Sequence, residues 1–214
     1  MIAVLTGDIV SSRKAPDKKW LARLSEVIEK KSSLKKAPKW TIFRGDGFQI
    51  ELPEPEKALQ VALIIRSGLR SVPQLFEQGI DARIGIGIGE KEFTGKSISE
   101  SDGQAYQLSG GVLDSLKNDK YKLHIKTPWP EVDLAINVAL QLASVVIDDW
   151  SLAESEIAWL WLTEGKTQVE MAKKLKITQP AIHKRFAGAH LSEISDLLTY
   201  YHDVVSHHTK SPKK

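Results

Sequence analysis

Two aspartates have the placement expected of a metal-binding carboxylate pair. Asp8 ends an apolar segment that we expect to form a strand, and Asp46 lies in the turn of a predicted hairpin. In a split β-α-β sheet the first strand lies beside the second hairpin strand, so both carboxylates are expected at one sheet edge. Close carboxylates repel each other unless a cation lies between them, and Mg²⁺ binds one or two carboxylates together with water and phosphate oxygens. The alternative is that Asp8 caps a turn and that Gly-Asp-Gly only closes the hairpin.

Two further segments have residue types that suit phosphate binding or close backbone approach. Residues 9–13 offer backbone N–H groups, two serine hydroxyls and a guanidinium to a phosphate chain, although the same residues also suit an ordinary surface loop. Isoleucine and glycine alternate over residues 83–89, so one face of this predicted strand is bare backbone. Strand glycines at this density imply that a helix or a ligand approaches closely.

A helix-turn-helix is predicted near the end of the chain. Thr167 and Glu170 have the spacing of a capping box, and Thr178 is the expected N-cap of a second helix. The turn between them contains Lys176 where glycine is common, and a left-handed lysine costs roughly 1 kcal/mol. Glutamine suits an adenine edge, whereas lysine and arginine suit guanine or phosphate. The residues expected to face DNA are Thr178, Gln179, Ala181, His183, Lys184 and Arg185. The alternative is an α-hairpin with a solvated basic face.

The elements that position these groups follow an α/β (α+β) pattern. Strand and helix signals alternate in the order β-α-β-β-α-β, with one further helix and strand, which predicts a ferredoxin-like domain over residues 1–127. Two prolines at 128 and 130 interrupt the pattern, so residues 128–150 are predicted to form a linker and an apolar helix. The remaining signals are all helical. They predict a helix-turn-helix domain over residues 151–206 and a disordered basic tail over 207–214.

Composition and charge limit the possible functions. The 214 residues include no cysteine, which excludes disulfides, thiolate nucleophiles and cysteine zinc sites and leaves Mg²⁺ or Mn²⁺ as the expected metal. No apolar run approaches the roughly 20 residues of a membrane span and no signal peptide is evident, so we expect a cytoplasmic protein without a membrane partner. Residues 166–214 have nine basic residues against four acidic ones, which favours an anionic partner. The helix over 131–149 is apolar around most of its circumference, so we expect it to be buried against the first domain or in a homodimer interface.

The motifs also resemble a known family. The segments TGDIV at 6–10, FRGDGF at 43–48 and RIGI at 83–86, in this order, resemble the class III nucleotidyl cyclase domain. The opening at residues 3–13 resembles the SatD family more closely, and members of that family have a helix-turn-helix after this domain. The cyclase resemblance implies that Asp8 and Asp46 bind the metal and that the Ile9 carbonyl assists. The residues it implies for a purine nucleotide are Val10, Ser11, Ser12, Arg13, Gly45 and Gly47.

Departures from the cyclase pattern weaken the prediction of catalysis. Tyr106 and Gly110 stand where cyclases have the asparagine and arginine of their transition-state machinery, and Ile42 replaces a base-selecting lysine. Losing one such charge-stabilising donor costs on the order of 10²–10³ in rate. We therefore expect a transcriptional regulator that binds double-stranded DNA and whose degenerate cyclase-like domain senses a nucleotide with a divalent metal. The alternatives are an active metal-dependent nucleotidyl cyclase or phosphotransferase with a helix-turn-helix, and a first domain that is only a scaffold.

Overall fold

A five-stranded mixed sheet forms the centre of the first part of the chain. The computed structural model describes residues 1–15, 17–29, 38–43, 45–95 and 97–210. The strands are β1 (Ile2–Val10), β2 (Lys39–Phe43), β3 (Gly47–Leu52), β4 (Asp81–Gly89) and β5 (Leu123–Lys126), in the order β2-β3-β1-β4-β5. All neighbours are antiparallel except β4 and β5, which are parallel. The first four strands have the order of a split β-α-β unit, which confirms the predicted α+β class.

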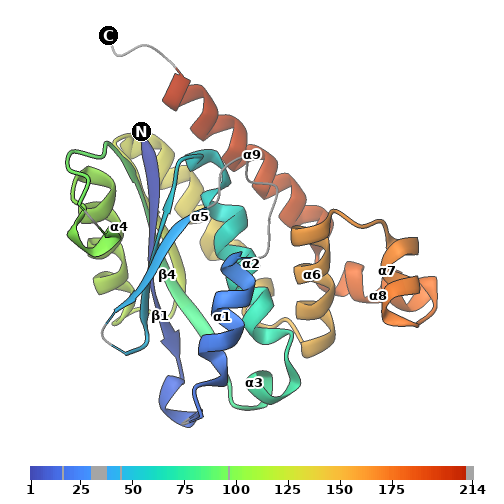
Figure 1. Cartoon of the computed structure of the whole chain (residues 1–214). Helices are drawn as coiled ribbons and strands as arrows, with labels where there is room; N and C mark the ends of the chain where they lie inside the picture. Colours follow the sequence, from blue (N-terminus) through green and yellow to red (C-terminus); the bar gives the residue numbers. More distant parts are fainter. Residues whose placement is uncertain (16, 30–37, 44, 96, 211–214) are drawn as a thin grey trace.

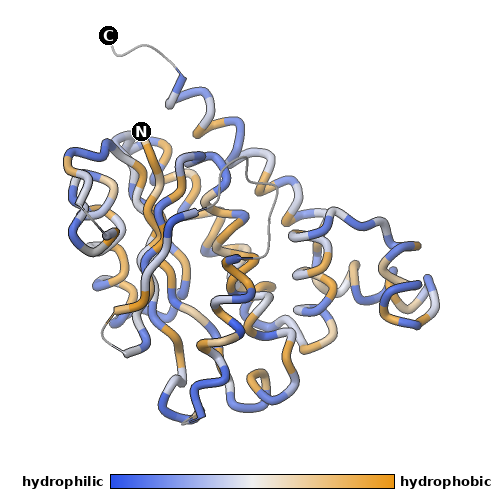
Figure 2. The backbone as a smooth tube through the Cα atoms, viewed as in Figure 1, coloured by the Kyte–Doolittle hydropathy of each residue, from blue (hydrophilic) through white to orange (hydrophobic). Residues whose placement is uncertain are grey.

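Helices cover both faces of this sheet (Figure 1). The helices of this part are α1 (Lys19–Glu29), α2 (Ala58–Arg70), the short α3 (Pro73–Glu77) and α4 (Gln104–Leu116), with 3₁₀ turns η1 (Ser12–Lys14), η2 (Pro55–Lys57) and η3 (Ile98–Glu100). Helices α1 and α2 lie on one side of the sheet and α4 lies on the other. In Figure 2 apolar colours run along the central strands, consistent with a core on both sides of β1 and β4.

The glycine-rich strand is covered by a helix. A Cβ on Gly87 would lie 2.3 Å from the Ala105 carbonyl oxygen, and one on Gly85 would lie 2.6 Å from the Ser109 carbonyl oxygen. The bare face of β4 therefore allows the backbone of α4 to approach closely, and Ile84 and Ile86 on the other face enter the core. The glycines of β4 serve helix packing.

The second part of the chain is entirely helical in the structure. Its helices are α5 (Pro130–Ile147), α6 (Leu152–Glu164), α7 (Gln168–Leu175), α8 (Gln179–Gly188) and α9 (Leu191–Lys210). Helix α6 packs against α2, and one hydrophobic cluster continues from β1 through α6 and α8 to Tyr201 of α9. The division at the two prolines stays a prediction, because the core is continuous across it.

The predicted disordered tail is wrong for its first four residues. Helix α9 continues through Lys210, and residues 211–214 of the predicted tail lie outside the described part of the chain. The physical reason is a tertiary contact: the His208 ring lies 4.7 Å from the Trp129 ring, and its Nε2 lies 3.8 Å from a Glu131 carboxylate oxygen. Contacts with the start of α5 therefore stabilise the last turns of α9.

A buried arginine joins the sheet to the end of α5. Arg66 of α2 is 1% exposed, and its guanidinium donates to both carboxylate oxygens of Asp81 at 3.0 and 2.7 Å. It also donates to Asp148 at 2.6 Å. Burial alone would lower the pKa of Arg66, but the two carboxylates raise it above its ordinary value. Lys122 Nζ also lies 2.7 Å from Asp148, and together these ion pairs fix the α5–α6 junction to β4.

A second arginine and a tryptophan extend this connection to the helix-turn-helix. Arg70 donates to the backbone carbonyls of Ile147 at 2.9 Å and Asp148 at 3.0 Å, and also to that of Trp150. The Trp150 indole N–H then donates to the Ala189 carbonyl, 2.9 Å away, at the end of α8. Buried hydrogen bonds thus run from α2 to the end of α8.

Candidate functional site

Asp8 is paired with an arginine in the structure. Asp8 of β1 lies directly opposite Arg83 of β4, so both side chains stand on the same face of the sheet. Arg83 Nε lies 3.0 Å from Oδ1 of Asp8, and Arg83 Nη2 lies 3.1 Å from Oδ2. Both carboxylate oxygens are therefore used in a bidentate ion pair. The guanidinium of Arg83 thus supplies the positive charge next to Asp8 that the sequence predicts to come from a metal ion.

Asp46 lies at the same sheet edge but has a different partner. Asp8 is opposite Gly47, and the Asp46 carbonyl accepts a hydrogen bond from the Ile9 N–H at 3.1 Å, so the expected juxtaposition is confirmed. The Asp46 carboxylate, however, accepts a hydrogen bond from the Ser12 hydroxyl at 2.6 Å. The side chain of Asp46 thus holds the β2–β3 turn against η1.

This arrangement does not fit a metal centre built on the two aspartates. Both oxygens of Asp8 already accept hydrogen bonds from Arg83, and bringing Asp8 to a metal would break that pair. Within the described ranges, no group of three or more Asp, Glu, His or Cys side chains gathers. The metal site stays a prediction from the sequence, and no chemical step is assigned to it.

A small cavity brings together four of the predicted site residues. It measures about 390 Å³, lies between η1 and the β2–β3 turn, and is lined by Ser12, Arg13, Ala15, Lys18, Trp20, Gly45 and Asp46. The sequence did not single out Lys18 and Trp20, because neither belongs to the quoted motifs. The other five residues of the predicted set do not line this cavity: Asp8, Ile9, Val10, Ser11 and Gly47. Ser11 has a left-handed φ of 61° and starts η1, and Gly47 is packed against Phe43.

Tyr106, which the cyclase resemblance pairs with an asparagine, belongs to a buried polar cluster under α4. Its hydroxyl donates to the Glu51 carboxylate, which also accepts a hydrogen bond from Lys91 Nζ at 2.7 Å. Burial acts to raise the pKa of Glu51, but the Lys91 and Tyr106 hydrogen bonds hold it below its ordinary value. Burial and the Glu51 carboxylate raise the pKa of the Tyr106 hydroxyl. These groups satisfy one another, and the cluster fixes α4 on the sheet.

The predicted helix-turn-helix has the expected local geometry. Thr167 Oγ1 accepts from the Glu170 N–H at 3.3 Å, and the Glu170 carboxylate accepts from the Thr167 N–H at 2.8 Å, which confirms the capping box. Lys176 takes the left-handed conformation, with φ 55°, as the turn requires. Thr178 caps α8 through the Ala181 N–H at 3.4 Å. Buried Ile182 packs the second helix into the core.

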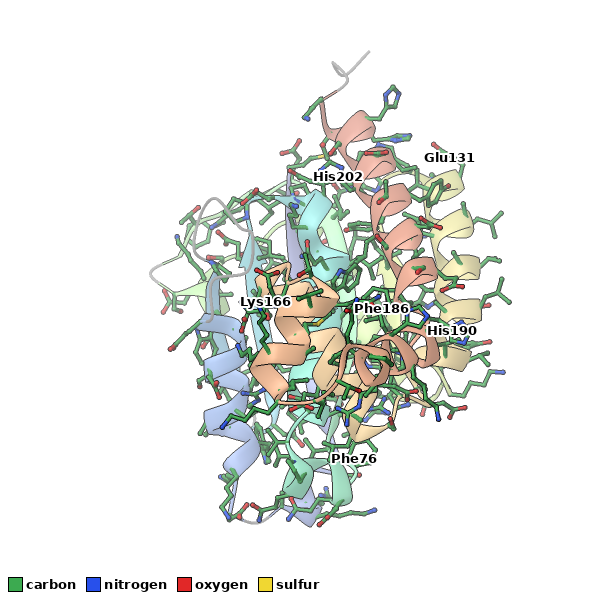
Figure 3. All side chains as sticks on the ribbon, turned by 90° about the vertical axis from the view of Figure 1, so that its right-hand side faces the viewer. Phe76, Glu131, Lys166, Phe186, His190 and His202 are labelled. Carbon is green, nitrogen blue, oxygen red and sulfur yellow. The ribbon has the colours of Figure 1, made fainter. Side chains whose placement is uncertain are left out.

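The N-terminal half of α8 presents polar side chains to solvent. Thr178, Gln179, His183 and Lys184 are exposed, and Ala181 is partly exposed. Arg185 turns toward α6 instead, where its guanidinium lies 3.6 Å from a Glu156 carboxylate oxygen. Figure 3 looks onto this end of the molecule, with α7 and α8 toward the viewer between Lys166 and His190. Five of the six predicted DNA-facing residues are therefore accessible to solvent, whereas Arg185 lies between α8 and α6.

Comparisons with known proteins add no family assignment. A scan of the chain against protein-family models and a search of curated proteins return no match. The SatD resemblance therefore depends on the motifs quoted above.

Proposed function

We propose that this protein is a transcriptional regulator that binds double-stranded DNA through α7 and α8. The observation that carries the proposal is the charge of this unit: residues 168–188 include five lysines and arginines and one acidic residue, Glu170, whose carboxylate is used in the capping box of α7. The exposed half of α8 thus meets the phosphates of a DNA groove without repulsion. We also propose a cytoplasmic location for this role.

Individual side chains of α8 have separable roles in this proposal. Gln179, at the first position of the helix, suits a bidentate contact with an adenine edge in the major groove. Lys184, five residues later and also exposed, suits guanine or a backbone phosphate. Arg185 supports the orientation of α8 through its ion pair with Glu156.

The first experiment selects DNA from a random-sequence pool and measures affinity for the enriched sequence by fluorescence anisotropy. Gln179→Ala should weaken binding to the selected site by roughly 5- to 150-fold, which corresponds to about 1–3 kcal/mol for one base contact. It should leave binding to unselected DNA almost unchanged. Lys14→Ala is the matched control because Lys14 is an exposed residue of η1, outside α7 and α8. Failure of the pool to enrich any sequence, or equal losses in both variants, would overturn the proposal.

The cavity beside η1 supports a second role, the binding of a purine nucleotide through its phosphates. Arg13 and Lys18 offer two cations at the rim of one cavity, and the Asp46 carboxylate in its lining already accepts a hydrogen bond from the Ser12 hydroxyl. Because Arg83 already neutralises Asp8, this binding does not depend on a metal.

Isothermal titration with ATP and GTP, in EDTA and in Mg²⁺, tests this second role. The expected result is similar affinity in both buffers and a loss of at least 10-fold in Arg13→Ala/Lys18→Ala. Binding that requires Mg²⁺ and disappears in Asp8→Ala would instead restore the metal prediction. Turnover of the nucleotide to a cyclic product would favour the cyclase alternative.

A further inference from the structure

One face of α5 is apolar and exposed along almost the whole helix. Leu134, Val138, Leu142 and Val145 are 70, 48, 71 and 68% exposed. They account for four of the seven large hydrophobic side chains that are exposed among the described residues. We refer to these four residues as the α5 stripe. The opposite side of α5 is buried against the rest of the protein, so the stripe is not a loosely packed part of the core. Soluble proteins seldom leave an apolar patch of this continuity in water.

The stripe also lacks charge. No charged residue occurs between Leu134 and Ile147, whereas Glu131 and Asp133 precede this segment and Asp148 and Asp149 follow it. A partner must therefore be apolar where it meets the middle of the stripe.

The structure argues against a lipid bilayer as that partner. Helix α5 is 18 residues long, and by length and composition it could cross a membrane, which corrects the expectation that no run of the chain approaches this length. Its buried side is fixed, however. The Asn137 amide accepts from the Ile125 N–H and donates to the Ile125 carbonyl, each at 2.9 Å, and so covers the edge of β5. Leaving the protein for a membrane would break these bonds, and the exposed acidic residues Glu131 and Asp149 at the helix ends oppose an anionic lipid surface.

We propose that the α5 stripe is the interface of a homodimer. Leu134, Val138 and Leu142 are four residues apart and form one ridge along the helix. Two copies of this ridge pack into each other at a crossing angle of about −50° around a two-fold axis near Val138. Crossing helices diverge at their ends, which keeps Glu131 and Asp149 of the two copies apart. The same surface on a second copy is therefore a suitable partner. It is uncharged, as the middle of the stripe requires, and its ridge is complementary to the ridge of the first copy.

The position of α5 relative to α8 fits this partner. In Figure 3 the helix-turn-helix faces the viewer, and α5, marked by Glu131 at its start, runs along the right-hand edge of the molecule. A two-fold axis that runs along the line of sight beside that edge places the second copy to the right of the first. The second copy then also turns its helix-turn-helix toward the viewer, so both units lie on one side of the dimer. Binding of two DNA half-sites requires this arrangement. This last argument rests on the proposed DNA-binding function, whereas the self-association itself does not.

Sedimentation equilibrium on the full chain tests the interface. We expect the wild type to have twice the 23.8 kDa chain mass at micromolar concentration. Val138→Glu and Leu142→Glu should each weaken the dimer by at least 10-fold, because they place a carboxylate at its centre. Phe93→Glu is the matched control, since Phe93 is 59% exposed but lies outside α5. Circular dichroism melts show whether each variant is folded.

Cross-linking provides a second, independent readout. The chain has no cysteine, so Val138→Cys introduces a single thiol near the proposed axis, and mild oxidation should give a covalent dimer that Phe93→Cys does not give.

A monomeric wild type, a dimer unaffected by both glutamate variants, or co-sedimentation of the wild type with phosphatidylglycerol vesicles in place of dimerisation would overturn the proposal. A dimer that binds no DNA would support the interface while refuting the DNA-binding function. A monomer that still binds DNA would refute the interface while supporting the DNA-binding function.

Discussion

Replacing Arg70 by methionine tests how strongly the sheet holds the second half of the chain. Arg70 is 8% exposed and donates to the carbonyls of Ile147, Asp148 and Trp150, where α5 ends and α6 approaches. The last carbonyls of a helix have no partner within that helix. Methionine keeps the apolar stem and removes all three bonds. Since each of the three buried acceptors left without a donor costs about 1–3 kcal/mol, we expect Arg70→Met to lower the free energy of unfolding by about 3–9 kcal/mol.

Chemical denaturation with circular dichroism measures this loss, and a thermal melt should show a decrease in Tm of roughly 6–36 °C for a chain of this size. Arg13→Met is the control because Arg13 is exposed, and a surface substitution should stay within about 0.5 kcal/mol. A loss below about 1 kcal/mol for Arg70→Met would show that the α5–α6 junction is not stabilised by this arginine.

Two further predictions concern α4 and the acid sensitivity of the fold. Gly87→Ala should destabilise the protein by about 1–3 kcal/mol, because the new methyl would meet the Ala105 carbonyl. Gly110 is an interior residue of α4, and a Cβ added there would contact nothing within 4 Å. Gly110→Ala should therefore stabilise the protein by about 0.5–1 kcal/mol. Denaturant titration of both variants checks that the two effects have opposite signs. Burial acts to raise the pKa of Asp148, but Arg66 and its other partners hold it below the ordinary value of 3.8. The stabilisation from this carboxylate is therefore present above that value and is lost as the pH falls through the lower folded-state pKa. Unfolding free energies measured from pH 6 to pH 2.5 should decrease toward acid, and Asp148→Asn should flatten the decrease. An equally steep decrease in the variant would contradict this assignment.

Features set by local patterns could be predicted from the sequence. The alternation of isoleucine and glycine in β4, the Thr167–Glu170 capping box and the left-handed turn at Lys176 each depend on residues within a few positions of one another. The order of the first four strands followed from the β-α-β-β-α-β pattern, because few sheet topologies accommodate it. The same logic placed Asp8 beside the Asp46 turn.

Features set by partners far away in the chain could not be predicted in this way. The bidentate pair of Asp8 depends on the register of β1 with β4, which puts Arg83 directly opposite. The contact of Arg185 with Glu156 depends on how α8 packs on α6, and sequence periodicity does not specify that rotation. The periodicity of α5 likewise indicated an apolar helix but could not show that one apolar side faces solvent while the other meets β5.

The salt dependence of DNA affinity tests the central claim most directly. For a protein that neutralises phosphates, the logarithm of the binding constant falls linearly with the logarithm of salt concentration, with a slope of about −0.9 per phosphate contact. We predict that the wild type binds its selected duplex with such a slope, and that Lys184→Ala reduces the magnitude of the slope by about one. Lys14→Ala should leave both slope and affinity unchanged. If the protein binds no duplex DNA, or if Lys184→Ala has the affinity and slope of the wild type, α8 is not a DNA-binding helix.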